Sequence, residues 1–148
     1  MGIVNIKVVD ESNYKACFNI KVKDEQEKFI TNPIECLAKA YVYREFVYPF
    51  AIYNDDLVIG FVMIRFNKEF NNYFIWQFMI DEKYQGKEYG KQSMNRVLEW
   101  IKSDGKSNEV VITYIEGDDI AKNLYTSLGF KEFQNFDGEV DMIKKIAR

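Results

Sequence analysis

The segment DEKYQGKEYGK, residues 81–91, joins two stretches with contrasting patterns. Before it, FIWQFMI at residues 74–80 is apolar almost throughout and predicts a buried strand. After it, apolar residues recur at helical spacing and predict an amphipathic helix over about residues 90–103: Met94, Val97, Leu98 and Ile101. A helix start carries unpaired N–H groups and a partial positive charge. A glycine-bearing loop at this point is therefore suited to holding a pyrophosphate with main-chain donors.

Two common phosphate-binding patterns do not fit this segment. A nucleotide-triphosphate P-loop has four residues between its first glycine and a Gly-Lys pair, followed by Ser or Thr. Here three residues separate Gly86 from Gly90, and Gln92 follows Lys91. The dinucleotide pattern G-x-G-x-x-G is absent from the sequence. Taken alone, the segment is either an anion-binding loop of another kind or a plain strand-to-helix turn.

Length and charge narrow the class of protein. The 148 residues predict one domain, residues 1–148, with a single sizeable core. A formal charge of −3 and the lack of a Lys/Arg cluster argue against a nucleic-acid partner. No apolar run approaches the ~18 residues of a membrane-spanning helix, and no secretory signal is visible. We therefore expect a cytoplasmic protein with no membrane partner.

The reactive side chains are restricted in type. The sequence has no histidine, which excludes Ser-His-Asp and Cys-His catalysis and zinc sites with histidine ligands. The two cysteines, Cys17 and Cys36, are too few for a four-cysteine metal site, and we expect both to be small buried hydrophobic residues without a disulfide. We therefore expect no metal, and chemistry that depends on carboxylates, phenols, backbone groups or a cofactor.

The remaining pattern predicts a strand, two helices, three strands, a helix, a strand, a helix and two strands. The predicted ranges are a strand at 3–9, helices at about 13–22 and 34–46, strands at 50–53, 57–66 and 74–80, a helix at 90–103, a strand at 110–115, a short helix ending near Gly129, and strands at 130–136 and 139–146.

This order, the loop at residues 81–91 and the motif NLYTSLGF at residues 123–130 resemble the GNAT family of acyl-CoA-dependent N-acetyltransferases. The family loop reads Gln or Arg, two residues, Gly, one residue, Gly or Ala. Gln85 and Gly90 fit it, whereas Glu88 replaces the first glycine. The resemblance implies an α+β fold, an α/β/α sandwich whose mixed, mostly antiparallel sheet has about seven strands, with about four helices. Residues 48–64 and 76–91 are similar to the bacterial spermine/spermidine acetyltransferase branch, which commonly has Arg where Gln77 stands.

The resemblance also implies acetyl-CoA as cosubstrate and assigns residues to it. The main chain of Phe78, Met79 and Ile80 would hold the pantetheine arm and donate an N–H to the thioester oxygen. Asp118 stands where the family usually has Asn, and Tyr125 would lie beside the sulfur as the acid for the leaving thiolate. The pyrophosphate would lie on the loop, which comprises Gln85, Gly86, Lys87, Glu88, Tyr89, Gly90 and Lys91.

Glu88 should turn its carboxylate to solvent while its N–H still donates. A positive φ at this position would cost roughly 1 kcal/mol or more.

For the base that deprotonates the acceptor amine, Asp81 and Glu116 are the candidates, since they follow the two strands around the cofactor. Glu35 and Glu45 are candidates for binding a cationic substrate. For all four, a solvated surface charge is the alternative.

The resulting hypothesis is acetyl transfer to a primary amine of a small cationic substrate, with a polyamine such as spermidine or spermine as one candidate, by direct transfer in a ternary complex. The alternatives are another amine (an antibiotic, an amino acid or a protein N-terminus) and a non-catalytic acyl-CoA-binding module. For the oligomeric state, a homodimer is one possibility.

Overall fold

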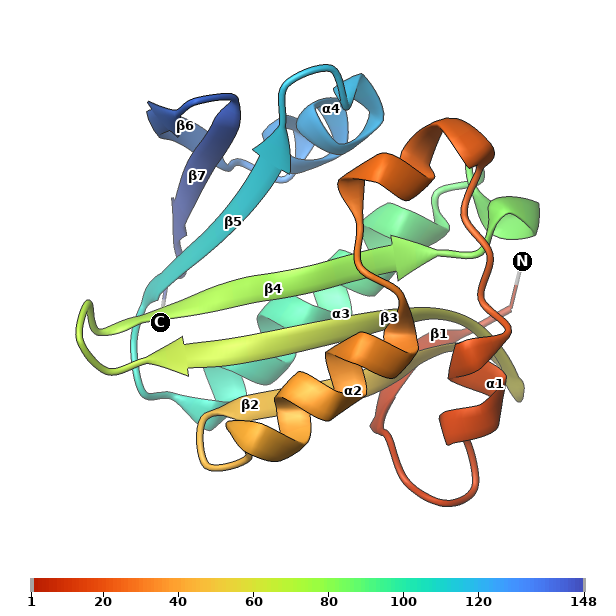
Figure 1. The fold of residues 1–148 in the computed structure, drawn as a ribbon. Coiled ribbons are helices and arrows are strands. Elements are labelled where there is room, and N and C mark those ends of the chain that lie inside the picture. Colours follow the sequence, from red (N-terminus) through yellow and green to blue (C-terminus); the bar gives the residue numbers. More distant parts are fainter. Residues whose placement is uncertain (1, 148) are drawn as a thin grey trace.

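A seven-stranded mixed sheet with the strand order β1-β2-β3-β4-β5-β7-β6 runs through the protein, as seen in a computed structural model that describes residues 2–147 (Figure 1). All neighbouring strands are antiparallel except β4 and β5, which are parallel. The strands are β1 (Val4–Val8), β2 (Val47–Asn54), β3 (Leu57–Asn67), β4 (Asn72–Ile80), β5 (Glu109–Ile115), β6 (Lys131–Phe136) and β7 (Glu139–Lys145).

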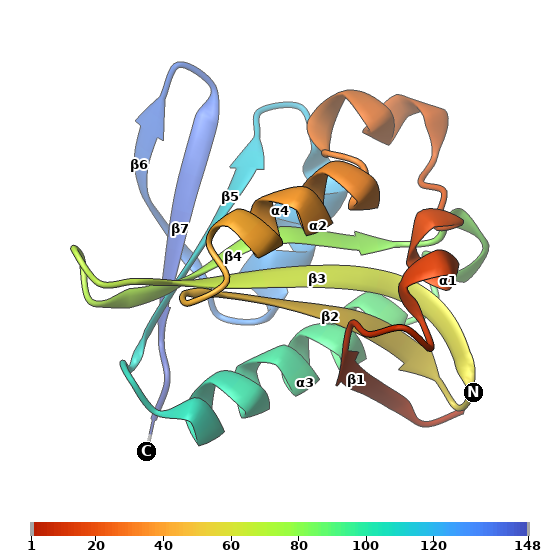
Figure 2. The same cartoon turned by 60° about the horizontal axis from the view of Figure 1, so that its bottom comes forward.

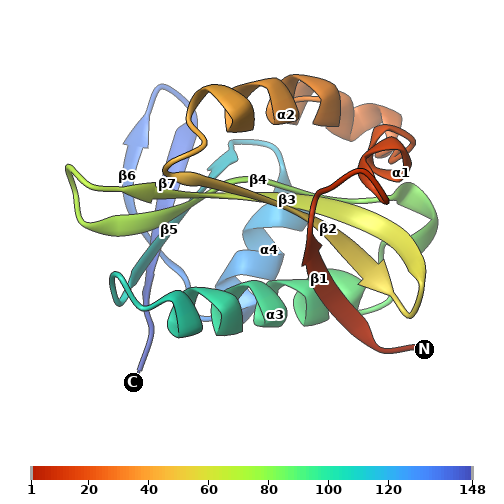
Figure 3. The same ribbon diagram turned by 90° about the horizontal axis from the view of Figure 1, so that it is seen from below.

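Helices cover both faces of the sheet. On one face lie α1 (Tyr14–Phe18) and α2 (Pro33–Val42), and on the other lie α3 (Tyr89–Asp104) and α4 (Asp119–Ser127) (Figures 2 and 3). Two short 3₁₀ helices, η1 (Asp24–Phe29) and η2 (Glu82–Tyr84), lie in the connections. The predicted α/β/α sandwich is confirmed. Within residues 2–147 no helix is both long and apolar enough to cross a membrane.

Each helical layer has its own core. The α3–α4 side buries the larger cluster, including Met94, Val97 and Ile101 of α3, as the helical spacing predicts. The α1–α2 side buries a smaller cluster around Cys17 and Cys36, both fully buried and both free thiols. Burial raises the pKa of each thiol to about 11, so both stay protonated at neutral pH. The prediction that they are buried hydrophobic residues is confirmed.

The region between β1 and β2 departs most from prediction. The first helix ends at Phe18 rather than near residue 22, because the chain leaves the helix to donate the Lys21 N–H to Asp81, which follows β4. The second helix ends at Val42 rather than 46, because β2 begins to pair with β3 at Val47. Between them, the polar stretch that carried no element prediction forms η1.

Candidate active site

β4 and β5 separate at one end of the sheet. They pair only over Tyr73–Ile75 and Val110–Ile112. Beyond this point β4 stays paired with β3 as far as Ile80, and β5 stays paired with β7 as far as Ile115, so the two strands diverge (Figure 1). On the sides that face each other, residues 76–80 and 113–115 have no strand partner among the described residues. The backbone N–H and C=O groups along these unpaired edges favour a ligand that can form hydrogen bonds with them.

A bulge in β4 lies at the point of separation. The β3 register passes from Ile75 directly to Gln77, so Trp76 is the extra residue. Such an insertion bends the strand and increases its twist. Trp76 directly follows the last residue of β4 that pairs with β5, and the bulge therefore accounts for the opening.

The opening leads into a cavity of about 490 Å³, within the usual size range of small-molecule sites. Its walls come from the diverging strands, from the start of α3, from α4 and from η1 with its flanking residues. The predicted cofactor residues that line it are Phe78, Met79, Ile80, Gln85, Gly86, Glu88, Gly90, Lys91, Asp118 and Tyr125.

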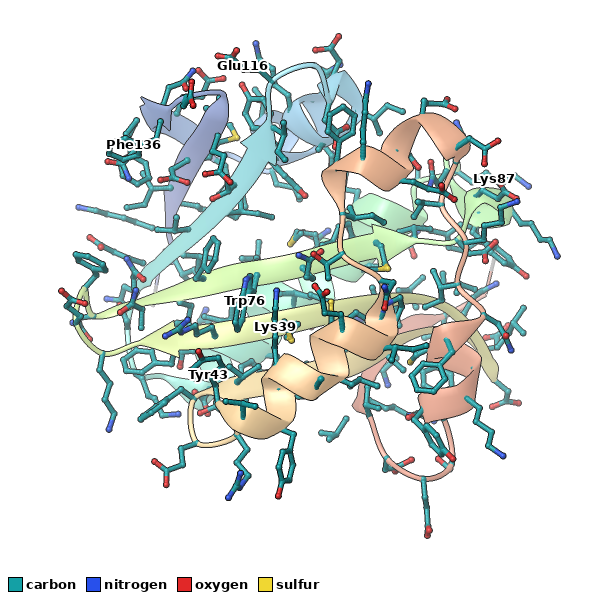
Figure 4. All side chains as sticks on the ribbon, in the orientation of Figure 1. Lys39, Tyr43, Trp76, Lys87, Glu116 and Phe136 are labelled. Carbon is teal, nitrogen blue, oxygen red and sulfur yellow. The ribbon has the colours of Figure 1, made fainter. Side chains whose placement is uncertain are left out.

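Two other predicted residues do not line the cavity. Lys87 is exposed and lies at the outer edge of the molecule (Figure 4). Tyr89 is buried in the core, where its ring packs edge-on against Tyr84 and its hydroxyl accepts a hydrogen bond from Asn54 Nδ2 at 3.3 Å. Any contact of Tyr89 with the cofactor would therefore be through its backbone.

The start of α3 has the geometry of an anion site. Gly86 and Glu88 both have positive φ, 75° and 69°, and the chain then enters the helix at Tyr89. Among the described residues no side chain accepts a hydrogen bond from the first turn of α3, and that turn holds no acidic residue. Its N–H groups are thus available to an anion. The positive φ at Glu88 is the condition under which we expected a cost of roughly 1 kcal/mol.

The Gln85 side chain joins two parts of the cavity wall. Its Nε2 donates to Gln26 Oε1 at 2.9 Å and to the Ile80 carbonyl at 2.8 Å, while Gln26 Nε2 donates to Gln85 Oε1 at 3.0 Å. This amide pair connects η1, which overlies the cavity, to the loop before α3. Gln26 was missed in the sequence because its partner lies 59 residues away.

Tyr125 is buried in the wall contributed by α4, and its ring packs 6.2 Å from that of Phe130, centroid to centroid. Burial, and secondarily the charge of Asp118, raises its pKa well above the usual range. The phenol is therefore protonated at neutral pH and can donate a hydrogen bond or a proton. Asp118 begins α4 and accepts the Ala121 N–H at 3.2 Å.

The four carboxylates predicted as base or substrate ligands all lie outside the cavity lining. Asp81 accepts N–H groups from Lys21 at 3.0 Å and Lys83 at 3.1 Å, and Glu116 accepts from Asn135 Nδ2 at 2.5 Å. Glu35 pairs with Lys39 at 3.5 Å, and Glu45 is exposed in the turn after α2. Their roles stay predictions, and their positions favour structural and surface functions.

An aromatic and cationic cluster, Trp76 with Lys39, Tyr43 and Arg65, lies on the α2 side of the opening (Figure 4). The Arg65 guanidinium stands 5.3 Å from the Trp76 ring centroid and 5.2 Å from that of Tyr43, and Lys39 Nζ stands 5.6 Å from Trp76. Arg65 Nε is buried without a hydrogen-bond partner among the described residues. Sequence reasoning missed this cluster, which combines α2, β3 and β4.

Comparison with known proteins agrees with this geometry. The chain is 29% identical over 155 aligned positions to the spermine/spermidine N(1)-acetyltransferase of Bacillus subtilis (strain 168), covering 97% of this chain and 99% of that protein. Among solved structures, the spermidine N-acetyltransferase of Vibrio cholerae in complex with CoA and spermine superposes with a TM-score of 0.76 at 16% identity, covering 96% and 95% of the two chains.

The ribosomal-protein-S18-alanine N-acetyltransferase of Escherichia coli gives a TM-score of 0.73 at 16% identity, covering 99% and 96%. At these identities the two structures establish the fold. Residues 12–130 match the family described as the acetyltransferase (GNAT) family. Because this match spans most of the chain, the protein belongs to the GNAT family and is an acyltransferase.

Proposed function

We propose that the protein transfers the acetyl group of acetyl-CoA directly to a primary amine in a ternary complex. The observation that carries the proposal is the cavity between the diverging β4 and β5, which extends from the uncapped start of α3 to the buried Tyr125. A CoA fits this shape: the pyrophosphate would lie on the N–H groups of residues 86–91, and the pantetheine arm along the unpaired edge of β4.

The residues of the cavity would divide the chemistry between them. Main-chain N–H groups at Phe78–Ile80 would stabilise the negative charge that develops on the thioester oxygen during attack. Tyr125, protonated at neutral pH, would donate a proton to the departing thiolate. The two cysteines are buried with raised pKa values, and with no histidine in the sequence no activated nucleophile for an acetyl-enzyme is evident.

Cofactor binding and turnover test this proposal separately. Acetyl-CoA should raise the melting temperature, because a ligand at 100 times its Kd stabilises the native state by about 2.7 kcal/mol. A panel of amines with acetyl-CoA should then release free CoA. Absence of a thermal shift at millimolar acetyl-CoA would refute the cofactor, and binding without CoA release from any amine would favour the acyl-CoA-binding module.

For the acceptor we propose a polyamine such as spermidine or spermine. The support is the curated relative with 29% identity over nearly the whole of both chains. In the amine panel, polyamines should then give the highest kcat/KM. A polyamine rate no higher than that of a simple monoamine would contradict the assignment.

A second acceptor class is favoured by the cluster around Trp76. Lys39 is paired with Glu35, but Arg65 forms no ion pair with a carboxylate in the described residues, so its charge would repel a polycation. An amine in a molecule that also carries a carboxylate, such as an amino acid or a peptide N-terminus, would instead be attracted. The variant Arg65→Gln separates the two: it should raise the KM of a carboxylate-bearing amine and lower that of a polyamine.

A further inference from the structure

One carboxylate reaches the cavity through a hydroxyl group. Thr113 on β5 and Asp141 on β7 are cross-strand partners, and Thr113 Oγ1 donates to Asp141 Oδ1 at 2.5 Å. Gln134 Nε2 donates to the second oxygen, Oδ2, at 2.6 Å. Thr113 lines the cavity, whereas none of the carboxylates predicted as the base does. Asp141 is thus held by two side-chain donors, with its first oxygen directed to a residue of the cavity wall.

The position of Thr113 in its strand places it at the narrow end of the opening. It directly follows Ile112, the last residue of β5 that pairs with β4. The anion site follows Ile80, at the wide end. Ile80 lies four residue steps along the strand from Trp76, a length of about 13 Å. An arm that starts at the anion site and follows β4 therefore brings its far end, which carries the reacting carbonyl, towards Thr113.

The side chains also divide between the two faces of the sheet. Ile112 and Tyr114, on either side of Thr113, pack in the core on the α3–α4 face, as does Tyr125. Because side chains alternate along a strand, Thr113 faces the α1–α2 side. The proton donor for the thiolate and the Thr113 hydroxyl are thus on opposite faces, which leaves the Thr113 side for the incoming amine.

We propose that Thr113 and Asp141 remove the proton from the acceptor ammonium, an assignment that rests on the proposed function. The Thr113 oxygen takes a proton from R–NH₃⁺ as its own hydroxyl proton passes to Asp141, giving R–NH₂ and a neutral carboxyl group. The free amine forms the C–N bond and the C–S bond breaks. Tyr125 gives its proton to the departing sulfur and is reprotonated, through water, by a proton that the new amide nitrogen loses. Asp141 returns its own proton to solvent.

The charges near Asp141 on this face are few. Glu139 lies two residues away on β7, Lys131 on β6 pairs with the adjacent Ile143, and Glu116 lies beyond the end of β5. From β5 itself the side chains on this face are Glu109, Val111, Thr113 and Ile115. Glu109 is the charged one, and it lies at the far end of the strand, opposite Lys145. Glu139 therefore offers a matched control, a carboxylate of the same strand and face without the link to Thr113.

The test compares Asp141→Asn with Glu139→Gln over a range of pH. Near pH 7 Asp141→Asn should lower kcat/KM for the amine by roughly 100-fold. The deficit should shrink as the pH approaches about 10, where an alkylamine loses its proton to water unaided. Glu139→Gln should keep the wild-type profile, and acetyl-CoA should raise the melting temperature of both variants equally.

A second pair keeps the assignment testable if Asp141→Asn does not fold. Thr113→Val removes the hydroxyl at nearly the same size and should reproduce the pH-dependent deficit, whereas Thr113→Ser should restore turnover. A wild-type pH profile in Asp141→Asn, or in Thr113→Val, would overturn the assignment while leaving the proposed function intact. A wild-type enzyme that turns over no amine would overturn both.

Discussion

Two helices begin beside the cavity, and their first turns differ in chemistry. The start of α3 follows a left-handed Glu88, has no acidic residue in its first turn and, within residues 2–147, receives no side-chain cap. The start of α4 is capped by Asp118 and has Asp119 in its first turn. Both helices have the same partial positive charge at this end. Only in α3 is that charge left for a ligand.

The difference indicates where each helix carries its function. The start of α3 would bind its ligand through backbone N–H groups, so a side chain such as that of Glu88 is tolerated as long as the main-chain conformation is kept. α4 acts with side chains, because the Asp118 carboxylate already occupies its first turn by accepting the Ala121 N–H, and Tyr125 supplies the hydroxyl. Substitutions at side-chain positions of α4 should therefore affect turnover, while substitutions at the start of α3 should affect stability and cofactor affinity.

The largest effect should come from Tyr125→Phe on α4. The ring and its packing remain while the hydroxyl is lost, so kcat should fall by roughly 10- to 1,000-fold with a much smaller change in acetyl-CoA affinity. Tyr114→Phe is the matched control, because Tyr114 also lines the cavity but donates its hydroxyl to Glu132 at 2.5 Å. Its kcat should stay within about threefold of wild type. Wild-type turnover in Tyr125→Phe would refute the role as acid.

The next effect should come from Gln26→Ala, which tests whether the loop before α3 depends on η1. The change removes the paired amide bonds to Gln85. If these bonds stabilise the cofactor-binding conformation of the loop by about 1 kcal/mol, their loss should raise the KM for acetyl-CoA about fivefold. Glu27→Ala, at an exposed position of the same short helix, should leave KM unchanged. Equal KM values for the two variants would show that the amide pair does not support the cofactor site.

A smaller effect is expected from Glu88→Gly at the start of α3. Relief of the positive φ should leave the free energy of unfolding unchanged or raise it by up to about 1 kcal/mol. Removing a carboxylate near phosphate should tighten CoA binding or leave it unchanged. Asp137→Gly, with φ 52° in the β6–β7 turn, relieves similar strain away from the cavity and serves as the control in titration calorimetry and thermal unfolding. A tenfold loss of CoA affinity in Glu88→Gly, about 1.4 kcal/mol, would reveal a positive role of the Glu88 side chain.

The smallest effect concerns the cap of α4 and its pH dependence. Burial, and secondarily the charge of Asp119, raises the pKa of Asp118 above its unfolded value of 3.8. The folded state therefore binds the proton of the Asp118 carboxyl group more tightly than the unfolded state does. Above the folded pKa the ionised carboxylate lowers the free energy of unfolding, and this penalty disappears as the pH falls towards 3.8.

Asn can provide the same cap without this proton. Asp118→Asn should accordingly be at least as stable as wild type near neutral pH, with an advantage that declines on acidification. The difference in melting temperature between the two proteins, measured from about pH 7 to pH 4, checks this. A difference independent of pH would contradict the raised pKa, and Asp137→Asn, an exposed turn residue, is the control.

Strongly patterned segments were predicted well. The helical spacing from Met94 to Ile101 and the apolar stretch at residues 74–80 depend on local periodicity, and both elements formed. The helix buries Met94, Val97 and Ile101, and the strand buries Ile75, Met79 and Ile80, while the other predicted residues are partly buried. The weakly patterned region between β1 and β2 was predicted less well. There a polar segment is ordered by contacts with distant residues, as in the bond between the Lys21 N–H and Asp81.

For the site, the loop at residues 81–91 and the motif around Tyr125 could be predicted, since each is a continuous stretch of sequence. The predicted carboxylates could not be placed, because the end of a strand fixes the position of a residue along the chain but not the direction of its side chain. Asp81 turned to backbone N–H groups and Glu116 to Asn135. Neither lines the cavity, so sequence position was a poor guide to which carboxylates reach it.

The sequence by itself determined the order of elements, the buried faces and the residue types available for chemistry, because hydrophobic period, helix caps and composition are local properties. Only the tertiary structure decided which of those residues meet. The Gln26–Gln85 pair joins residues 59 apart, and Thr113 meets Asp141 across 28 residues. Such contacts depend on strand register and on where β4 bulges, which are fixed by packing over the whole sheet rather than by any single segment.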